Sequence, residues 1–196
     1  MELTSITPEP EALRALAHPV RLRILGILRH EGPATASGLA TRLGLNSGAT
    51  SYHLRQLAQH GFIVDDAERG TGRDRWWQAA HQATVTDPAD LDMPEDRDSF
   101  DAFMQAVAVV NTERLQRAVE ERALLPRAWQ DASTLSDLSL HLTPARARAL
   151  VDAVIDLIRE WDEEPEDGDD VADFVITLQA YVRPGTLAIA PDEGTP

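Results

Sequence analysis

The sequence contains no cysteine, and this absence excludes several kinds of chemistry at once. Disulfide bonds, thiolate metal sites and cysteine nucleophiles all need a sulfhydryl group that the chain does not have. Lysine is absent as well, so each of the 18 basic residues is an arginine. No local motif of the G-x-S-x-G or H-E-x-x-H type occurs either, and we therefore expect a protein that is not an enzyme.

Long apolar runs are also missing from the chain. No stretch approaches the ~18–20 apolar residues of a membrane-spanning helix. The first ten residues, MELTSITPEP, lack the basic and apolar regions of a secretory signal. These absences favour a cytoplasmic location. The apolar fraction of 43% over 196 residues is sufficient for a core, so we expect one large globular domain or two small ones.

The acidic residues are unevenly distributed along the chain, whose formal net charge is −15. Residues 1–80 contain nine arginines and eight acidic residues, whereas residues 81–196 contain nine arginines and 25 acidic residues. Attraction to DNA depends on the local field, which decays over a Debye length of ~8–10 Å. The near-neutral first part can therefore bind phosphate although the whole chain is acidic.

Two helices are predicted at the start of the chain. Residues 9–17, EPEALRALA, place four apolar side chains at helical spacing. His18-Pro19 then interrupts the pattern, because proline disfavours the α conformation in the preceding residue and suits the first turn of a new helix. The helix that starts at Pro19 is apolar on more than one face, which predicts that it is largely buried.

A helix-turn-helix is predicted next. The first of its helices follows Thr35 and ends at Leu43, where Gly44 can take the left-handed conformation of a sharp helix exit. Asn46 is a good N-cap for the second helix, over residues 47–60. A small residue, Ala40, stands where the two helices would cross, and this combination is typical of the motif.

The outward face of the helix over residues 47–60 carries short polar side chains and one arginine. Such side chains let the backbone approach DNA closely and still offer donors to base edges and phosphates. The helix N-terminus adds free N–H groups and a partial positive charge. The residues expected to contact DNA here are Asn46, Ser47, Gly48, Ser51, Tyr52 and Arg55.

A β-hairpin is predicted directly after this helix. Residues 62–64 are typical of a strand, GTGR (70–73) of a turn, and residues 75–78 of the returning strand. In this position the hairpin would be the wing of a winged helix-turn-helix, whose arginines meet the DNA backbone or the minor groove. The arginines at or beside its tip are Arg69, Arg73 and Arg75.

Aromatic side chains near this motif allow more than one interpretation. Trp76 and Trp77 can stack on a ligand, but we favour Trp77 as the anchor of the hairpin on the helices, with Trp76 partly exposed. We interpret His18 as a cap or packing residue. His53 lies near the buried stripe of its helix, which favours a structural role.

Three stretches together resemble the ArsR-like family of bacterial winged-helix transcriptional regulators: LRALAHPVRLRIL (13–25), LATRLGLNSGATSYHLRQLAQHGFI (39–63) and the basic hairpin with its tryptophan pair. The resemblance covers about residues 11–80. It implies a homodimer that occupies an operator, usually represses, and releases the DNA when a signal arrives. It also implies that residues 47–60 are the recognition helix and residues 62–78 the wing.

The chain departs from the metal-sensing members of that family. Their cysteine pair would fall in Thr35–Leu43, which has no cysteine, and their zinc-binding histidines in residues 98–123, which have no histidine. We therefore expect no metalloid, zinc or nickel sensing, no metal site and no cofactor. The acidic loop at residues 162–170 has ligands suited to a divalent cation but lacks the full spacing of a calcium loop, so we interpret it as solvated.

Residues 82–98 are acidic, contain proline and lack periodicity, which predicts a linker. Ser99 then caps a long amphipathic segment that reaches Leu125. At 1.5 Å per residue this helix would span ~35 Å, more than internal packing of a small domain requires, so we interpret it as the dimer helix. The interface residues expected on it are Phe100, Phe103, Met104, Val107 and Val110.

The last part of the chain predicts a small β-α-β unit. Apolar residues alternate over residues 138–142 and 174–182, and a helix that Thr143 caps lies between them. The expected fold class is mainly α with small β. The expected domains are a winged helix-turn-helix over 1–81, a linker over 82–98, and a dimerisation helix with a C-terminal β-α-β domain over 99–196.

Two functions are compatible with these features. The first is a sequence-specific regulator of transcription that binds double-stranded DNA at a pseudo-palindromic operator as a homodimeric repressor, with the C-terminal part regulating or extending the dimer and a possible small-molecule effector. The second is a protein-interaction module, in which the acidic C-terminal half docks a basic partner and the winged helix is a scaffold. A pair of recognition helices on half-sites one helical turn apart supplies the specificity that one helix cannot, and we favour the regulator.

Overall fold

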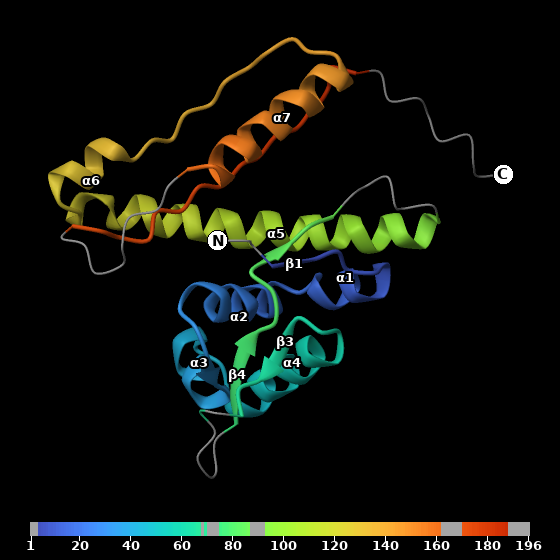
Figure 1. Cartoon of the computed structure of the whole chain (residues 1–196), viewed down its shortest axis with the longest axis vertical. Coiled ribbons are helices and arrows are strands. Elements are labelled where there is room, and N and C mark those ends of the chain that lie inside the picture. Colours follow the sequence, from blue (N-terminus) through green and yellow to red (C-terminus); the bar gives the residue numbers. More distant parts are fainter. Residues whose placement is uncertain (1–3, 68, 70–74, 87–92, 162–169, 188–196) are drawn as a thin grey trace. The chain divides into compact units, whose positions relative to one another are not determined.

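The computed structural model describes residues 4–67, 69, 75–86, 93–161 and 170–187 (Figure 1). The chain forms two compact units, Met1–Gln130 and Asp131–Pro196. Most of the described residues are helical, with small sheets in the first unit, and the expected fold class is confirmed at this level. Within the part of the chain that the structure describes, none of the helices has both the length and the apolarity of a membrane span.

The first two helices are α1 (Pro10–Leu16) and α2 (Pro19–His30), as the sequence predicts. His18 separates them with extended backbone, and its Nδ1 accepts a hydrogen bond of 3.2 Å from the backbone N–H of Val20. This bond confirms the interpretation of His18 as a cap. The inner face of α2 is buried in the core, with Ile24, Leu25 and Leu28 at its centre.

The helix-turn-helix consists of α3 (Ala36–Leu43) and α4 (Ser47–Gln59). The side chain of Thr35 accepts from the N–H of Gly38 at 3.1 Å, and that of Asn46 accepts from the N–H of Ala49 at 2.8 Å. Between the helices, Gly44 has φ +64°, the left-handed conformation that favours glycine. The predicted cap Asn46 and the predicted turn are therefore confirmed, and the structure adds Thr35 as the cap of α3.

The wing belongs to a three-stranded antiparallel sheet with the order β2 (Ala34–Thr35), β4 (Trp76–Ala79), β3 (Ile63–Asp65). In the β3–β4 ladder, Asp65 lies opposite Trp77. The hairpin was predicted, but β2 was not, because a two-residue strand gives no periodic signal. A parallel pair, β1 (Ser5–Ile6) and β5 (Ala83–Thr84), was also not predicted.

The core of the first unit joins the helices to the wing sheet. Trp77 on β4 is buried and packs in this core, which confirms its role as the anchor of the hairpin, whereas Trp76 is partly exposed. The largest fully buried side chains come from α1, α2, α3, α4 and the start of the hairpin: Leu16, Ile24, Leu25, Leu39, Leu54, Leu57, Phe62 and Ile63.

The long helix is α5 (Pro94–Glu121), and it begins earlier than Ser99, where the sequence placed the end of a linker. Pro94 suits the first helical position, and Glu95 and Asp96 are favourable near the positive end of the helix dipole. Part of the predicted linker is therefore helix, and β5 forms another part of it. Residues 87–92 lie outside the described residues.

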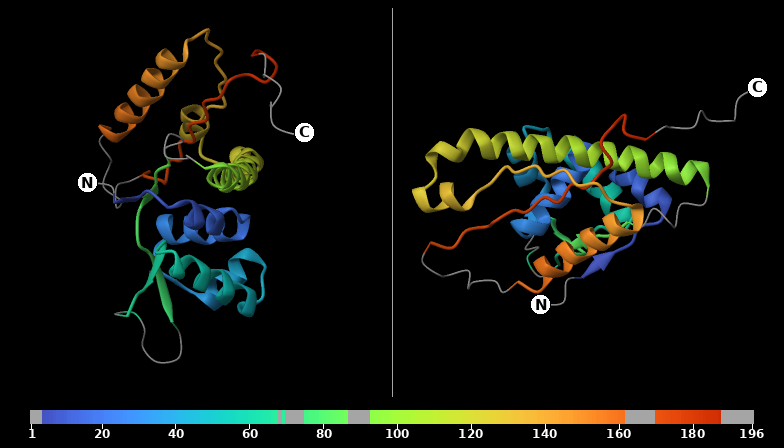
Figure 2. Two further views of the ribbon diagram at one scale, coloured as in Figure 1. Left: turned by 90° about the vertical axis from the view of Figure 1, so that its right-hand side faces the viewer. Right: turned by 90° about the horizontal axis from the view of Figure 1, so that it is seen from above.

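α5 packs against α1 and α2, so the chain divides into units at residue 130 rather than at residues 81 and 98. A short 3₁₀ helix, η2 (Arg122–Leu124), follows α5, and α6 (Arg127–Ala132) leads into the second unit. Figure 1 and the left view of Figure 2 show the layers of the first unit: α5 lies on one side, α1 and α2 form the middle, and α3, α4 and the wing lie on the other side.

Four of the five residues predicted at the dimer interface pack within their own chain. Phe103 and Val110 are buried, and Phe100 and Val107 are partly buried and pack against the core of their own chain. Among the five predicted interface residues, only Met104 is exposed, at 45%. An amphipathic stripe shows that one face of a helix is buried, but it does not show which element buries it. Here α1 and α2 cover the more apolar face of α5.

The second unit contains the predicted helix, α7 (Pro144–Arg159), with the side chain of Thr143 accepting from the N–H of Arg146 at 3.4 Å. The flanking strands of the expected β-α-β unit are absent from the described residues, because residues 133–143 and 171–183 form no ladder. This prediction was wrong. Alternating apolar residues can bury one face, but a strand also needs a neighbouring strand in register.

Candidate nucleic-acid interface

The outward face of α4 is polar and accessible. Ser47, Gly48, Tyr52 and Arg55 are exposed, and Ser51 is half-buried. The opposite face of the helix is buried through Thr50, Leu54 and Leu57. The sequence separated these two faces correctly, and residues 47–60 contain no acidic side chain. A surface of this kind offers donors to DNA without a carboxylate that repels phosphate.

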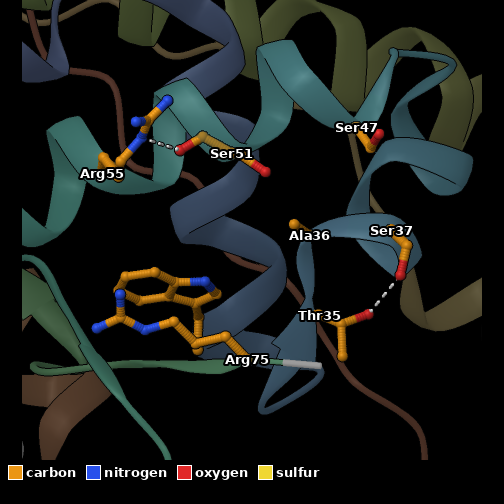
Figure 3. Close-up of a pocket in the computed structure, with 8 residues that line it drawn as sticks. Thr35, Ala36, Ser37, Ser47, Ser51, Arg55 and Arg75 are labelled. Carbon is orange, nitrogen blue, oxygen red and sulfur yellow. Dashed lines mark hydrogen bonds between the residues drawn. The ribbon is translucent and has the colours of Figure 1, made fainter. Parts of the chain in front are cut away.

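Asn46 differs from the other predicted contact residues because its side-chain oxygen is engaged in the α4 cap. Asn46 is therefore the cap of α4, and only the N–H groups of its side-chain amide remain as donors to DNA. Arg55 is oriented along the helix, since its Nε donates to the carbonyl oxygen of Ser51 at 3.2 Å (Figure 3).

A pocket of about 350 Å³ lies between α3, α4 and β4. We call it the hydroxyl–arginine pocket (Figure 3). Its described lining residues include no acidic side chain; they are Thr35, Ala36, Ser37, Ser47, Ser51, Arg55, Arg75 and Trp77. Hydroxyl groups from β2, α3 and α4 and two guanidinium groups, from α4 and from the residue before β4, are thus brought together, and such a set suits a phosphate-like anion.

Helix termini add to the positive character of the hydroxyl–arginine pocket. Ala36 and Ser37 begin α3, and Ser47 begins α4. The caps satisfy the N–H groups of Gly38 and Ala49, which belong to the third residue of each helix. Earlier N–H groups of a helix have no intrahelical acceptor, and together with the helix dipole they favour an anion.

The described wing arginines each contact an acidic residue. Nε of Arg75 donates to Oδ2 of Asp65 at 2.7 Å, and the Arg75 guanidinium lies 4.1 Å from the centroid of the Trp77 ring. Nε of Arg69 lies 3.4 Å from Oδ2 of Asp66, which is mostly buried. Arg73, the third predicted wing arginine, lies outside the described residues. The sequence placed these arginines on the hairpin but did not identify their acidic partners.

Behind the outward face, two histidines from different helices are in contact. The rings of His18 and His53 have centroids 4.7 Å apart, and Tyr52 meets His53 edge to face at 5.5 Å. Burial lowers the pKa of His18, and the positive charge of Arg21 adds to the effect. Burial also lowers the pKa of His53, followed by the charges of His18 and Arg21. Both shifts favour the neutral form of the imidazole rings.

Two arginines of α2 join this helix to other elements of the first unit. Arg29 donates to the carbonyl oxygen of His81 and to Oγ1 of Thr84, both at 2.9 Å, and its burial lowers its pKa to about 10. Arg23 on α2 makes a bidentate contact with Glu113 on α5, at 2.5 and 2.9 Å. The first pair of bonds fixes the chain as it leaves the wing, and the second joins α2 to α5.

Among the described residues, no group of three or more His, Asp or Glu side chains is placed to hold a metal ion. Residues 162–169 of the acidic loop lie outside the described part of the chain.

Comparisons with known proteins agree with the fold of the N-terminal part. Residues 16–65 match the family model described as a helix-turn-helix domain. The HTH-type transcriptional regulator YgaV of Escherichia coli is 42% identical over 62 residues, which cover 31% of this chain and 60% of that protein. The HTH-type transcriptional regulator NmtR of Mycobacterium tuberculosis is 44% identical over 54 residues, which cover 28% of this chain and 44% of that protein. The chain thus spans less than two thirds of the length of these relatives.

Two solved structures are also similar. That of Rv0081 from Mycobacterium tuberculosis has 24% identity and a TM-score of 0.33, and covers 54% of this chain and 90% of its own. That of RV1404 from the same organism has 19% identity and a TM-score of 0.30, and covers 78% of this chain and 83% of its own.

Proposed function

Because the N-terminal part of the chain is a helix-turn-helix domain of the ArsR type, we propose that the protein is a transcriptional regulator that binds double-stranded DNA. α4 enters the major groove, with Ser51, Tyr52 and Arg55 facing the base edges. The wing lies against the backbone, and Arg75 contacts a phosphate. Asn46 caps α4 and offers only its amide N–H groups to DNA.

The hydroxyl–arginine pocket is the observation that carries this proposal. It joins the start of α3, the outward face of α4 and the wing strand β4, the elements that flank a DNA backbone in a winged helix-turn-helix. Its hydroxyl and guanidinium groups recognise phosphate through charge-assisted hydrogen bonds. Contacts to phosphate fix the register of a protein on DNA, and contacts from the recognition helix then read the sequence.

The regulator acts as a homodimer on a pseudo-palindromic operator. Support comes from the side of α5 that faces away from α1 and α2, where Met104, Leu115 and Val119 are 45%, 47% and 50% exposed. This side keeps Met104 of the five positions that the sequence favoured and adds Leu115 and Val119. Two recognition helices also supply the specificity that a few base pairs under one helix cannot.

We further propose that the dimer represses transcription and that the second unit regulates it or extends the dimer. In that unit none of the described residues is buried, and large apolar side chains of α7 and its flanking segments are exposed. A unit of this size gains its stability by burying such side chains, and a second copy or an effector would cover them.

The test is selection of genomic fragments by the purified full-length protein, followed by footprinting of the selected site. We expect a protected site with two half-sites about one helical turn apart. Arg55→Ala should reduce the preference for this site over other duplexes, whereas Arg75→Ala should weaken binding to all duplexes by a similar factor. Arg148→Ala, which removes an exposed arginine of the second unit, is the control. Equal effects of Arg55→Ala and Arg148→Ala would contradict the proposed orientation of α4.

A further inference from the structure

One wing arginine that lines the hydroxyl–arginine pocket is already paired within the chain. Nε of Arg75 donates to Oδ2 of Asp65 at 2.7 Å, and both side chains are accessible, at 59% and 43% exposure. The charge of the guanidinium is thus largely balanced before DNA arrives. The pairing is unexpected at a surface that binds polyanions, because a carboxylate there repels phosphate.

The fold does not require this carboxylate. Asp65 is the last residue of β3, and the ladder places it opposite Trp77 through the backbone. The exposed ion pair contributes little to folding, since such pairs are screened by water and salt. By contrast, the neighbouring Asp66 is mostly buried and accepts from the backbone N–H of Arg69 at 3.3 Å, so it shapes the chain where the hairpin begins.

Asp65 is also not needed to position Arg75. The guanidinium lies over the Trp77 ring at 4.1 Å from its centroid, a cation–π contact that holds it at the edge of the pocket. Trp77 itself is buried in the core. The role that remains for the carboxylate is electrostatic.

We propose that Asp65 is an internal counter-ion that competes with DNA phosphate for Arg75. It lowers the affinity for every duplex by the same factor. The preference among DNA sequences then comes from the side chains of α4 that face the bases. Asp65 thereby sets the affinity of the protein for duplex DNA in general, and the ratio of affinities between operator and random duplexes depends on the side chains of α4. This inference rests on the proposed DNA-binding function.

Asp65→Asn separates charge from geometry, because the amide oxygen of asparagine still accepts from Nε of Arg75. We expect this variant to bind operator and random duplexes more tightly than the wild type at low salt. One additional phosphate contact adds about 0.9 to the slope of log affinity against log salt. The ratio of the DNA affinity of the variant to that of the wild type should therefore decrease by about 3.5-fold between about 50 mM and about 200 mM salt.

Asp152→Asn is a matched control. Asp152 is another exposed carboxylate paired with an arginine, since Nε of Arg148 lies 3.1 Å from its Oδ1, and the substitution changes the net charge equally. It lies in the second unit, and its effect on binding should be small. The gain from Asp65→Asn should also vanish in an Arg75→Ala background, because the carboxylate then has no guanidinium to release.

The outcomes separate this inference from the function on which it rests. A wild type that binds no duplex at low salt contradicts the proposed function, and the inference with it. If the wild type binds but Asp65→Asn matches Asp152→Asn, or keeps its gain without Arg75, only the role of Asp65 is refuted. Weaker binding by Asp65→Asn, with an unchanged thermal midpoint, would show that the carboxylate supports Arg75 and would also refute the counter-ion role.

Discussion

At the scale of single residues, the most informative side chains are those whose partners come from another element. His18 caps α2 and contacts His53 of α4, so the start of one core helix touches the recognition helix from behind. The sequence predicted both histidines as structural residues. It did not predict their contact, because the contact depends on how α2 and α4 cross.

This pair leads to a prediction about acid stability. Both pKa values are lowered below the ordinary histidine value of 6.5, so the unfolded chain takes up protons at a higher pH than the folded chain does. The free energy of unfolding should therefore decrease as the pH falls below about 6.5, until the lowered pKa values are passed. Urea unfolding between about pH 7.5 and about pH 5 measures this decrease.

The variant His18→Asn/His53→Gln should lose part of that pH dependence, because asparagine can still cap α2 but neither side chain titrates. His141→Gln, at an exposed position in the second unit, is the control and should keep the pH dependence of the wild type. An unchanged decrease in the double variant would contradict the account. Arg21, Arg23 and Tyr52 are the other titratable groups that act on these histidines.

At the scale of elements, the sequence predicted best where the signal is local. The predicted cap Asn46 and the predicted exit at Gly44 lie within a few residues of the hydrogen bonds they make. The strands expected at residues 138–142 and 174–182 are the opposite case. Alternation describes one segment, whereas a ladder needs a second segment in register, and no such partner occurs among the described residues.

The turn of the helix-turn-helix gives a prediction at this scale. A Cβ at Gly44 would meet no atom within 4 Å, but the φ of +64° is unfavourable for alanine. Gly44→Ala should lower the free energy of unfolding by about 1–2 kcal/mol, measured by urea denaturation.

Gly38→Ala is the matched control within the same motif. Gly38 lies in α3, where its Cβ would be 3.4 Å from Oγ1 of Thr35, and alanine is the better helix former there. We expect this variant to be as stable as the wild type or more stable. If Gly38→Ala lowers the free energy of unfolding as much as Gly44→Ala does, the backbone conformation of the turn is not the cause of the destabilisation.

At the scale of the whole molecule, the distribution of charge is reconciled with DNA binding. Most of the acidic residues lie in residues 81–196, and the net charge of residues 1–80 is close to zero. The predicted long helix exists, but α1 and α2 cover the face that the sequence assigned to the interface. Sequence periodicity identifies an apolar face without saying whether the same chain or another chain covers it.

The proposed interface on the exposed side of α5 gives a prediction about assembly. Leu115→Glu places a charge on the exposed side of α5 and should shift the protein from dimer to monomer in sedimentation, with a corresponding loss of operator affinity. The matched control is Val85→Glu, which adds the same charge at an exposed apolar position of the first unit, directly after β5, and should leave the dimer intact. Dimers of unchanged stability in Leu115→Glu would exclude this side of α5 as the interface.

The most direct test of the central claim is a fluorescence anisotropy titration of a labelled genomic duplex with the full-length wild-type protein at two salt concentrations. If the hydroxyl–arginine pocket and α4 meet DNA, binding at about 50 mM salt should weaken at about 200 mM by roughly 3.5-fold for each phosphate contact. Absence of binding to every duplex at the lower salt concentration would contradict the claim.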